Sequence, residues 1–214
     1  MRTFGSVAVT LAALGVSLLS GCFSHEWSHE LESRAIGLET VQLPHEGDVD
    51  ALSLDNSTVY MRVLAVHALS SKCVGGILLV PLDVRMRGEE ELNSPAGRYN
   101  RPLPTTSVVK VGITPGPQGF DMEFGKITLE YLGKAYRPAR VFAGARRVTD
   151  KEVLAPGNET VWYNLTFPVH IDAKDQFSIL LDGYTVSGQA RAVQAIEFGP
   201  KDVHRVAEYG ERGC

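Results

Sequence analysis

A regular alternation of apolar and polar residues between Val161 and Ile171 constrains the fold of this chain more than any other feature. Every second residue of the segment is apolar or aromatic, and the intervening positions are mostly polar. A period of two puts alternate side chains on opposite faces, so the segment predicts a half-buried β-strand. Pro168 has no amide hydrogen to donate to a neighbouring strand, which favours an edge or a bulge there.

Several other segments show the same alternation. In residues 78–86 the side chains expected to face inward are Leu78, Val80, Leu82, Val84 and Met86. Further strands are predicted over residues 59–65, 127–131, 177–181, 184–186 and 196–198, with a hairpin turn at Gly133-Lys134 and a turn at Asp182-Gly183. Because no clear helical period separates these segments, the sequence predicts an all-β fold, an antiparallel β-sandwich.

The chain divides into four predicted parts. Residues 57–203 are expected to form the sandwich, and residues 204–214 a C-terminal tail. Residues 22–56 are mixed and polar, which predicts a tether with a short helix from Glu26 to about Ile36. The polar segment from Gly88 to Pro104 is predicted to be a long loop, a kind of segment that often carries function.

The late strands are similar to those of immunoglobulin-like sandwiches on bacterial surfaces. The similarity covers Pro156-Gly157, the strand from Val161 to Ile171 and the strand from Phe177 to Leu181. The resemblance implies an immunoglobulin-like sandwich. The cysteine and tryptophan spacing of antibody domains is not evident in this sequence.

Residues 1–21 have the pattern of an export signal. Arg2 supplies a positive start, and residues 7–19 are apolar or small without any charge. This run is short for a membrane span, which needs roughly 20 residues. The segment therefore predicts a signal peptide that is removed from the mature protein.

The end of this segment, Leu19, Ser20, Gly21 and Cys22, resembles the lipobox of bacterial lipoprotein precursors. The resemblance implies cleavage before Cys22 and acyl chains such as palmitate on Cys22, which would be the membrane anchor. Phe23 in place of aspartate favours the outer membrane, facing the periplasm or the surface, over the inner membrane. The alternatives are an ordinary signal peptide with a chance cysteine, or an uncleaved anchor.

The charge of the chain bears on its partners. Loss of residues 1–21 removes Arg2 and no acid, so the formal net charge changes from −4 to −5. General affinity for nucleic acid requires clustered basic charge. We therefore expect no nucleic-acid partner.

Two cysteines remain after Cys22 is assigned to lipid. Cys73 and Cys214 would lie in an oxidising compartment, so we hypothesise a disulfide between them. Such a bond would tie the last residue to the body of the fold and stabilise it by about 4 to 5 kcal/mol in the chain-entropy model. The alternative is a buried Cys73 and a free terminal thiol.

A basic run stands out in this acidic chain. Residues 134–147 contain no acid and five cations, which are Lys134, Arg137, Arg140, Arg146 and Arg147. One hypothesis is contact with an anionic surface of the cell envelope, such as a phosphorylated glycolipid or a cell-wall polymer. The alternative is that the run is the solvated face of a hairpin and its loop.

Residues 25–29 match the HExxH motif of zinc peptidases. On a helix, His25 and His29 would be metal ligands and Glu26 the general base. No extended zinc-peptidase motif follows, and the match begins three residues after Cys22. We expect no catalytic metal and no cofactor here, and the alternatives are casual metal binding by an exposed pair or a chance match.

Trp162 is the single residue with the clearest binding potential, because it occupies the polar parity of its strand. An outward tryptophan can anchor a sugar or a protein, or it can lie under a neighbouring loop. Together these features predict a non-catalytic envelope lipoprotein that binds an envelope protein or a cell-wall polymer. A metal-dependent hydrolase using His25, Glu26 and His29, and a purely structural scaffold, are the alternatives.

Overall fold

The computed structural model describes residues 22–77, 80–93, 105–149 and 151–209. Strands account for 65% of the residues and helices for 4%, with antiparallel sheets, so the predicted all-β sandwich is confirmed. The chain forms two compact units. Within the described residues, the sandwich unit contains 31–67, 105–149 and 151–202, and the small unit contains 22–30, 68–77, 80–93 and 203–209.

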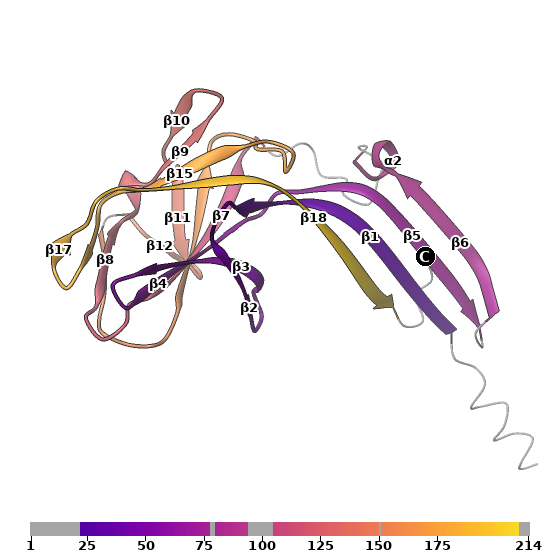
Figure 1. Ribbon diagram of the computed structural model, residues 1–214, viewed down its shortest axis with the longest axis horizontal. Helices are drawn as coiled ribbons and strands as arrows, with labels where there is room; N and C mark the ends of the chain where they lie inside the picture. The colour runs from indigo at the N-terminus through magenta and orange to yellow at the C-terminus, as the bar shows by residue number, and fades with distance from the viewer. Residues whose placement is uncertain (1–21, 78–79, 94–104, 150, 210–214) are drawn as a thin grey trace, which may run out of the picture. The chain divides into compact units, whose positions relative to one another are not determined.

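The largest sheet of the sandwich unit, which we call the β14 sheet, has the strand order β12-β11-β14-β7-β4-β3-β2. Its pairs are antiparallel throughout (Figure 1). The strands are β2 (Glu39–Leu43), β3 (Gly47–Leu54), β4 (Ser57–Val63), β7 (Ser107–Thr114), β11 (Arg140–Ala143), β12 (Arg146–Arg147) and β14 (Val161–Phe167).

The facing sheet, which we call the β15 sheet, continues the sandwich with the order β10-β9-β15-β18-β1 in this unit. A third sheet of four short strands has the order β13-β8-β16-β17. The elements are β1 (Cys22–Ala35), β8 (Phe120–Glu123), the 3-10 helix η1 (Phe124–Lys126), β9 (Thr128–Tyr131), β10 (Lys134–Tyr136), β13 (Lys151–Leu154), β15 (Phe177–Leu181), β16 (Tyr184–Val186), β17 (Gln189–Ala190) and β18 (Gln194–Tyr209).

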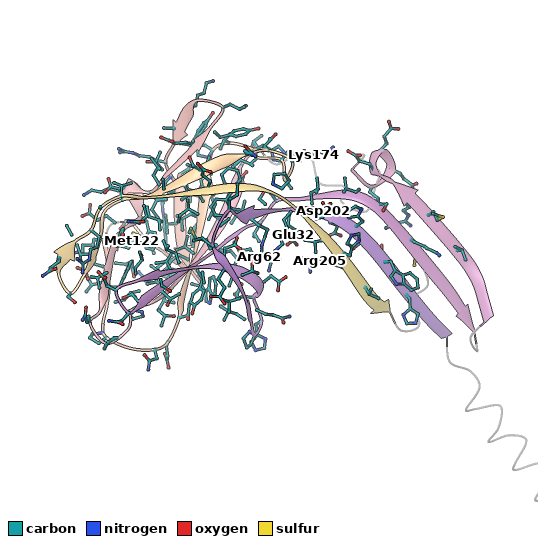
Figure 2. All side chains as sticks on the ribbon, viewed as in Figure 1. Glu32, Arg62, Met122, Lys174, Asp202 and Arg205 are labelled. Carbon is teal, nitrogen blue, oxygen red and sulfur yellow. The ribbon has the colours of Figure 1, made fainter. Side chains whose placement is uncertain are left out.

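The core fills the space between these sheets and follows the alternation of the sequence. Tyr163, Leu165 and Phe167 of β14 are fully buried, as are Leu181 of β15 and Met122 of β8. Figure 2 labels Met122 among the side chains that fill the sandwich unit. Full burial of a large apolar side chain stabilises a fold by about 1.5–3 kcal/mol, so the inward parity of β14 contributes strongly.

In its described residues, the small unit consists of strand segments and one short helix. The first part of β1 and the last part of β18 lie in it with β5 (Val66–Ile77), β6 (Val80–Gly88) and the helix α2 (Glu89–Asn93). Strands β5 and β6 pair antiparallel, with a register shift between Gly75 and Gly76. Helix α2 falls within the predicted long loop, of which residues 94–104 lie outside the described residues.

The predicted inward face of β6 is wrong for the residues whose side chains are described. Val84 is 54% exposed and Met86 is 77% exposed. The pairing places Met86 opposite Lys72, whereas the other parity of β5 contains the buried Ser71 and Cys73. On the opposite parity of β6, Arg85 is exposed and Arg87 is half-buried, so none of these four side chains is buried in a core.

The prediction of a tether with a helix after Cys22 is wrong, because residues 22–54 form β1, β2 and β3. The charged residues that suggested a solvated tether are partly buried in pairs. The Ala35 amide donates a hydrogen bond of 2.8 Å to the Asp50 carboxylate, and the Arg34 Nε lies 3.3 Å from it. Strand β18 also includes the start of the predicted tail, of which residues 210–214 lie outside the described residues.

The turns show how closely sequence signals located the hairpins. The turn between β9 and β10 is Leu132-Gly133, one residue before the predicted position, and both residues have positive φ. The turn at Asp182-Gly183 is confirmed, with Gly183 at φ +73, although it connects strands of different sheets. The predicted immunoglobulin-like relationship stays a prediction. No helix in the described part of the chain is long and apolar enough to cross a membrane.

Candidate binding face

Trp162 projects from β14 on the side of the β14 sheet that faces away from the core, which we call the outer face. Its neighbours Tyr163 and Val161 belong to the core-facing parity. Across the sheet, Trp162 is opposite Gly112 of β7, and Gly112 is opposite Tyr60 of β4. Three strands that are distant in sequence therefore bring these residues into one row.

The absence of a side chain at Gly112 lets the indole ring of Trp162 lie against the sheet. A methyl group added at Gly112 would come within 2.9 Å of three carbons of the indole ring. The Tyr60 ring lies beside it, with 6.2 Å between ring centroids and a tilt of 32°. Trp162 and Tyr60 are both half-buried, so together they form an aromatic platform on the outer face.

Cations border this platform. The Lys110 ammonium lies 5.6 Å from the centroid of the Trp162 ring, a favourable cation–π distance. Lys110 also forms an ion pair with the Glu46 carboxylate. Arg62 of β4, labelled in Figure 2, donates a hydrogen bond to the Glu46 carbonyl oxygen. Glu46, from the turn between β2 and β3, thus holds both cations in place.

The next row of the outer face joins these cations to the predicted basic run. Arg62 is opposite Lys110, Lys110 is opposite Asn164, and Asn164 is opposite Phe142 of β11. Phe142 is in turn opposite Arg147 of β12. The row therefore has cations at both ends and an amide and an aromatic ring between them.

The basic run does not form one patch, since its members lie on different surfaces. Arg140 and Arg147 are exposed on the outer face. Lys134 is in the β9–β10 hairpin of the other sheet, and Arg137 is in the loop after β10. Arg146 occupies the core-facing parity at the end of its sheet, because it is opposite Ala143 and is bonded to Glu152.

The contacts of Arg146 are structural. Its guanidinium makes two hydrogen bonds to the Glu152 carboxylate, at 2.6 and 2.8 Å, which lower the pKa of Glu152. The Tyr163 hydroxyl donates to the same carboxylate at 3.4 Å. Burial, reinforced by the charge of Glu152, raises the pKa of Tyr163 to about 12. Because its charge is already paired, Arg146 is a poor candidate for anion contact.

The HExxH match lies in β1 and not in a helix. Alternate residues of a strand point to opposite sides, so His25 and His29 face one way and Glu26 faces the other. Glu26 is buried, and the His29 ring stacks on His204 of β18 with 4.3 Å between centroids. The arrangement of a zinc peptidase is therefore not formed. No group of three metal-ligating side chains occurs among the described residues.

The cysteines are described only in part. Cys22 begins β1, and its side chain lies outside the described set. Cys73 is buried and disulfide-bonded. The sequence contains three cysteines, so the partner of Cys73 is either Cys22 or Cys214. The predicted pairing with Cys214 and the lipidation of Cys22 both stay predictions.

Two hollows that share Ile36 and Glu197 in their linings occur elsewhere in the described part of the sandwich unit. One, of about 240 Å³, includes Glu130, Ser178 and Glu197 in its lining. The other, of about 330 Å³, includes Leu38 and Gln194. Neither lining contains a histidine, a cysteine or a cation, so neither matches the predicted anionic contact.

Comparisons of the chain with protein-family models, with curated proteins and with solved structures gave no match. The candidate site therefore rests on geometry. Of its residues, Trp162, Arg140 and Arg147 were singled out from the sequence, whereas Tyr60 and Lys110 were not. The alternation of apolar and polar residues in β4 and β7 puts Tyr60 and Lys110 on the face away from the core. Only the strand order shows that they adjoin Trp162.

Proposed function

We propose that this protein is a lipid-anchored lipoprotein of the bacterial cell envelope whose sandwich is a non-catalytic binding module. The lipobox-like ending at Cys22 supports the anchor, and Phe23 in place of aspartate favours the outer membrane over the inner membrane. The outer face of the β14 sheet is the binding surface, and its ligand is a molecule of the envelope.

The observation that carries the binding proposal is the position of Trp162 on Gly112 beside Tyr60. An amphipathic aromatic ring held against a sheet offers a large contact area at a low cost in side-chain entropy. Lys110, Arg62 and Asn164 add polar groups around the rings. Binding surfaces commonly combine a few aromatic anchors with such a polar border.

Site-specific photo-crosslinking in the intact bacterium tests this proposal. A photoreactive residue replaces Thr166, a half-buried residue on the outer-face parity of β14. The control replaces Ser178, which is equally half-buried but lies in the β15 sheet. We expect a recurrent envelope adduct from position 166 and none from position 178. Equal labelling at both positions, or none at either, would refute the outer face as a binding surface.

A further inference from the structure

Arg140 and Arg147 form a close pair of like charges on the outer face. Arg147 is opposite Phe142, and Arg140 lies two residues before Phe142 on the same strand. This is a diagonal relationship across antiparallel strands, for which the spacing is about 7–8 Å. Arginine side chains are long and flexible, so residues at this diagonal spacing can bring both guanidinium groups to a single anionic group.

Arg140 and Arg147 differ from Lys110 and Arg146 of the same sheet in how their charge is balanced. Lys110 is paired with Glu46, and Arg146 is paired with Glu152. Within the described residues, neither Arg140 nor Arg147 makes an ion pair, and both side chains are exposed. Like charges at close range repel each other, and a bound anion would relieve that repulsion.

The arginine pair is continuous with the aromatic platform. Asn164 is next to Trp162 on the outer parity of β14 and opposite Phe142, so it lies between the platform and the arginine pair. The separation from Asn164 to Arg147 is two strand spacings, about 10 Å. A ligand that contacts both regions needs a ring to pack on Trp162 and an anionic group displaced from that ring along the sheet.

Resting on the proposed function, we propose that the ligand of the outer face is an acidic glycan. A sugar ring packs its C–H face on Trp162, and the Asn164 amide hydrogen-bonds to hydroxyl groups. A carboxylate or phosphate on a neighbouring sugar accepts hydrogen bonds from Arg140 and Arg147, since guanidinium groups match the geometry of these anions. A flat aromatic ring beside an amide favours a saccharide over an anionic lipid surface, which would present no ring to the platform.

Two matched pairs of polysaccharides test this inference with the purified mature chain. Polygalacturonate is compared with its methyl ester, and yeast phosphomannan with the same mannan after removal of phosphate. Binding is followed by calorimetry, and by fluorescence in a Trp27→Phe background so that Trp162 is the only reporter. We expect at least one acidic form to bind about tenfold more tightly than its neutral counterpart, with the preference reduced by added salt.

Variants test separately whether the anionic group binds the arginine pair and whether the sugar ring binds the aromatic platform. Arg140→Gln combined with Arg147→Gln should remove the roughly tenfold preference for the acidic form while leaving binding of the neutral form unchanged. Lys134→Gln combined with Arg137→Gln removes the same charge outside the outer face and should change nothing. Gly112→Ala should weaken binding of both forms, because the indole ring must leave the sheet.

Three results would overturn the inference. They are failure of both acidic polysaccharides to bind, equal binding of acidic and neutral forms, and arginine-dependent binding to phosphatidylglycerol vesicles in place of the polysaccharides. If any of these results occurs but position 166 still gives adducts in the photo-crosslinking experiment, the proposed function stands and only the acidic glycan as ligand is refuted. No adduct at position 166 would remove the proposed function as well.

Discussion

At the scale of single residues, the buried carboxylate of Asp50 organises the part of the sandwich that looked like a tether. Asp50 is 1% exposed and accepts hydrogen bonds from the Ala35 amide and the Thr40 hydroxyl. Arg34 lies against it and donates a hydrogen bond of 2.9 Å to the Asp48 carbonyl. These contacts link β1, β2 and β3, which explains how so polar a segment forms strands.

Removing the Asp50 carboxylate should therefore destabilise the sandwich. Asp50→Ala leaves the buried Arg34 with only Glu32, at 3.8 Å, as a counter-charge, and we expect a loss of about 3 kcal/mol in the free energy of unfolding. Thr40→Val removes one hydrogen bond to the same carboxylate and should cost about 1 kcal/mol. Urea denaturation of the wild type, Asp50→Ala and Thr40→Val measures both losses of stability. Equal stability of Asp50→Ala and wild type would show that the ion pair contributes nothing.

The pH dependence of this contribution has a definite sign. Burial raises the pKa of Asp50 above its ordinary value of 3.8, and the hydrogen bond from Ala35 and the charge of Arg34 oppose this only in part. The folded state then binds more protons than the unfolded state. The contribution of Asp50 to stability is therefore greatest below pH 3.8 and is lost as the pH rises through the folded pKa.

The comparison with Asp50→Asn isolates this effect, because asparagine does not titrate. As the pH falls from about 7 towards 4, the wild type should gain stability relative to Asp50→Asn. Parallel denaturation series of the two proteins measure the difference. The opposite trend would mean that Arg34 and the hydrogen bonds lower the pKa of Asp50 by more than burial raises it.

Gly112 gives a residue-scale test of the aromatic platform that does not depend on a ligand. Gly112→Ala should displace the Trp162 ring, since the added methyl group would lie 2.8 Å from it. In a Trp27→Phe background, we expect a shift of the fluorescence maximum. Gly125→Ala is the control, because nothing lies within 4 Å of a methyl group at that position. Identical spectra for both variants would mean that Trp162 does not rest on Gly112.

At the scale of elements, the sequence predicted strands well where one face is apolar and the other polar. Strand β14 has this pattern, and its inward residues Tyr163, Leu165 and Phe167 are buried as expected. Strands β1 and β3 were missed because Glu30, Arg34 and Asp50 are buried through pairing, which a local pattern does not reveal. The site could be predicted only in part for the same reason, since β14, β7 and β4 become neighbours only in the folded sheet.

Strand β7 was also missed, although it lies between β14 and β4. Its inward residue Val111 is 1% exposed, whereas Val108 is half-buried on the outer face. We expect Val111→Ala to cost about 2 kcal/mol of stability, because it leaves a cavity in the core. Val108→Ala should cost less than about 1 kcal/mol. Equal losses in thermal or urea unfolding would contradict the assigned faces of β7.

At the scale of the whole molecule, the proposed anchor and the disulfide depend on each other. The Cys22 thiol cannot carry lipid and also form a disulfide. Because Cys73 is disulfide-bonded and the chain has three cysteines, lipid on Cys22 requires the bond to join Cys73 to Cys214. Whether Cys22 carries lipid therefore determines both the membrane attachment and whether Cys214 is the disulfide partner of Cys73.

The most direct test is the intact mass of the protein purified from the membranes of its bacterium, with a peptide map under non-reducing conditions. The account predicts a chain that begins at an acylated Cys22 and contains a peptide linking Cys73 to Cys214. A chain that keeps Met1 and carries no lipid, or a peptide linking Cys73 to Cys22, would contradict the lipid anchor and with it the proposed place of the protein in the envelope.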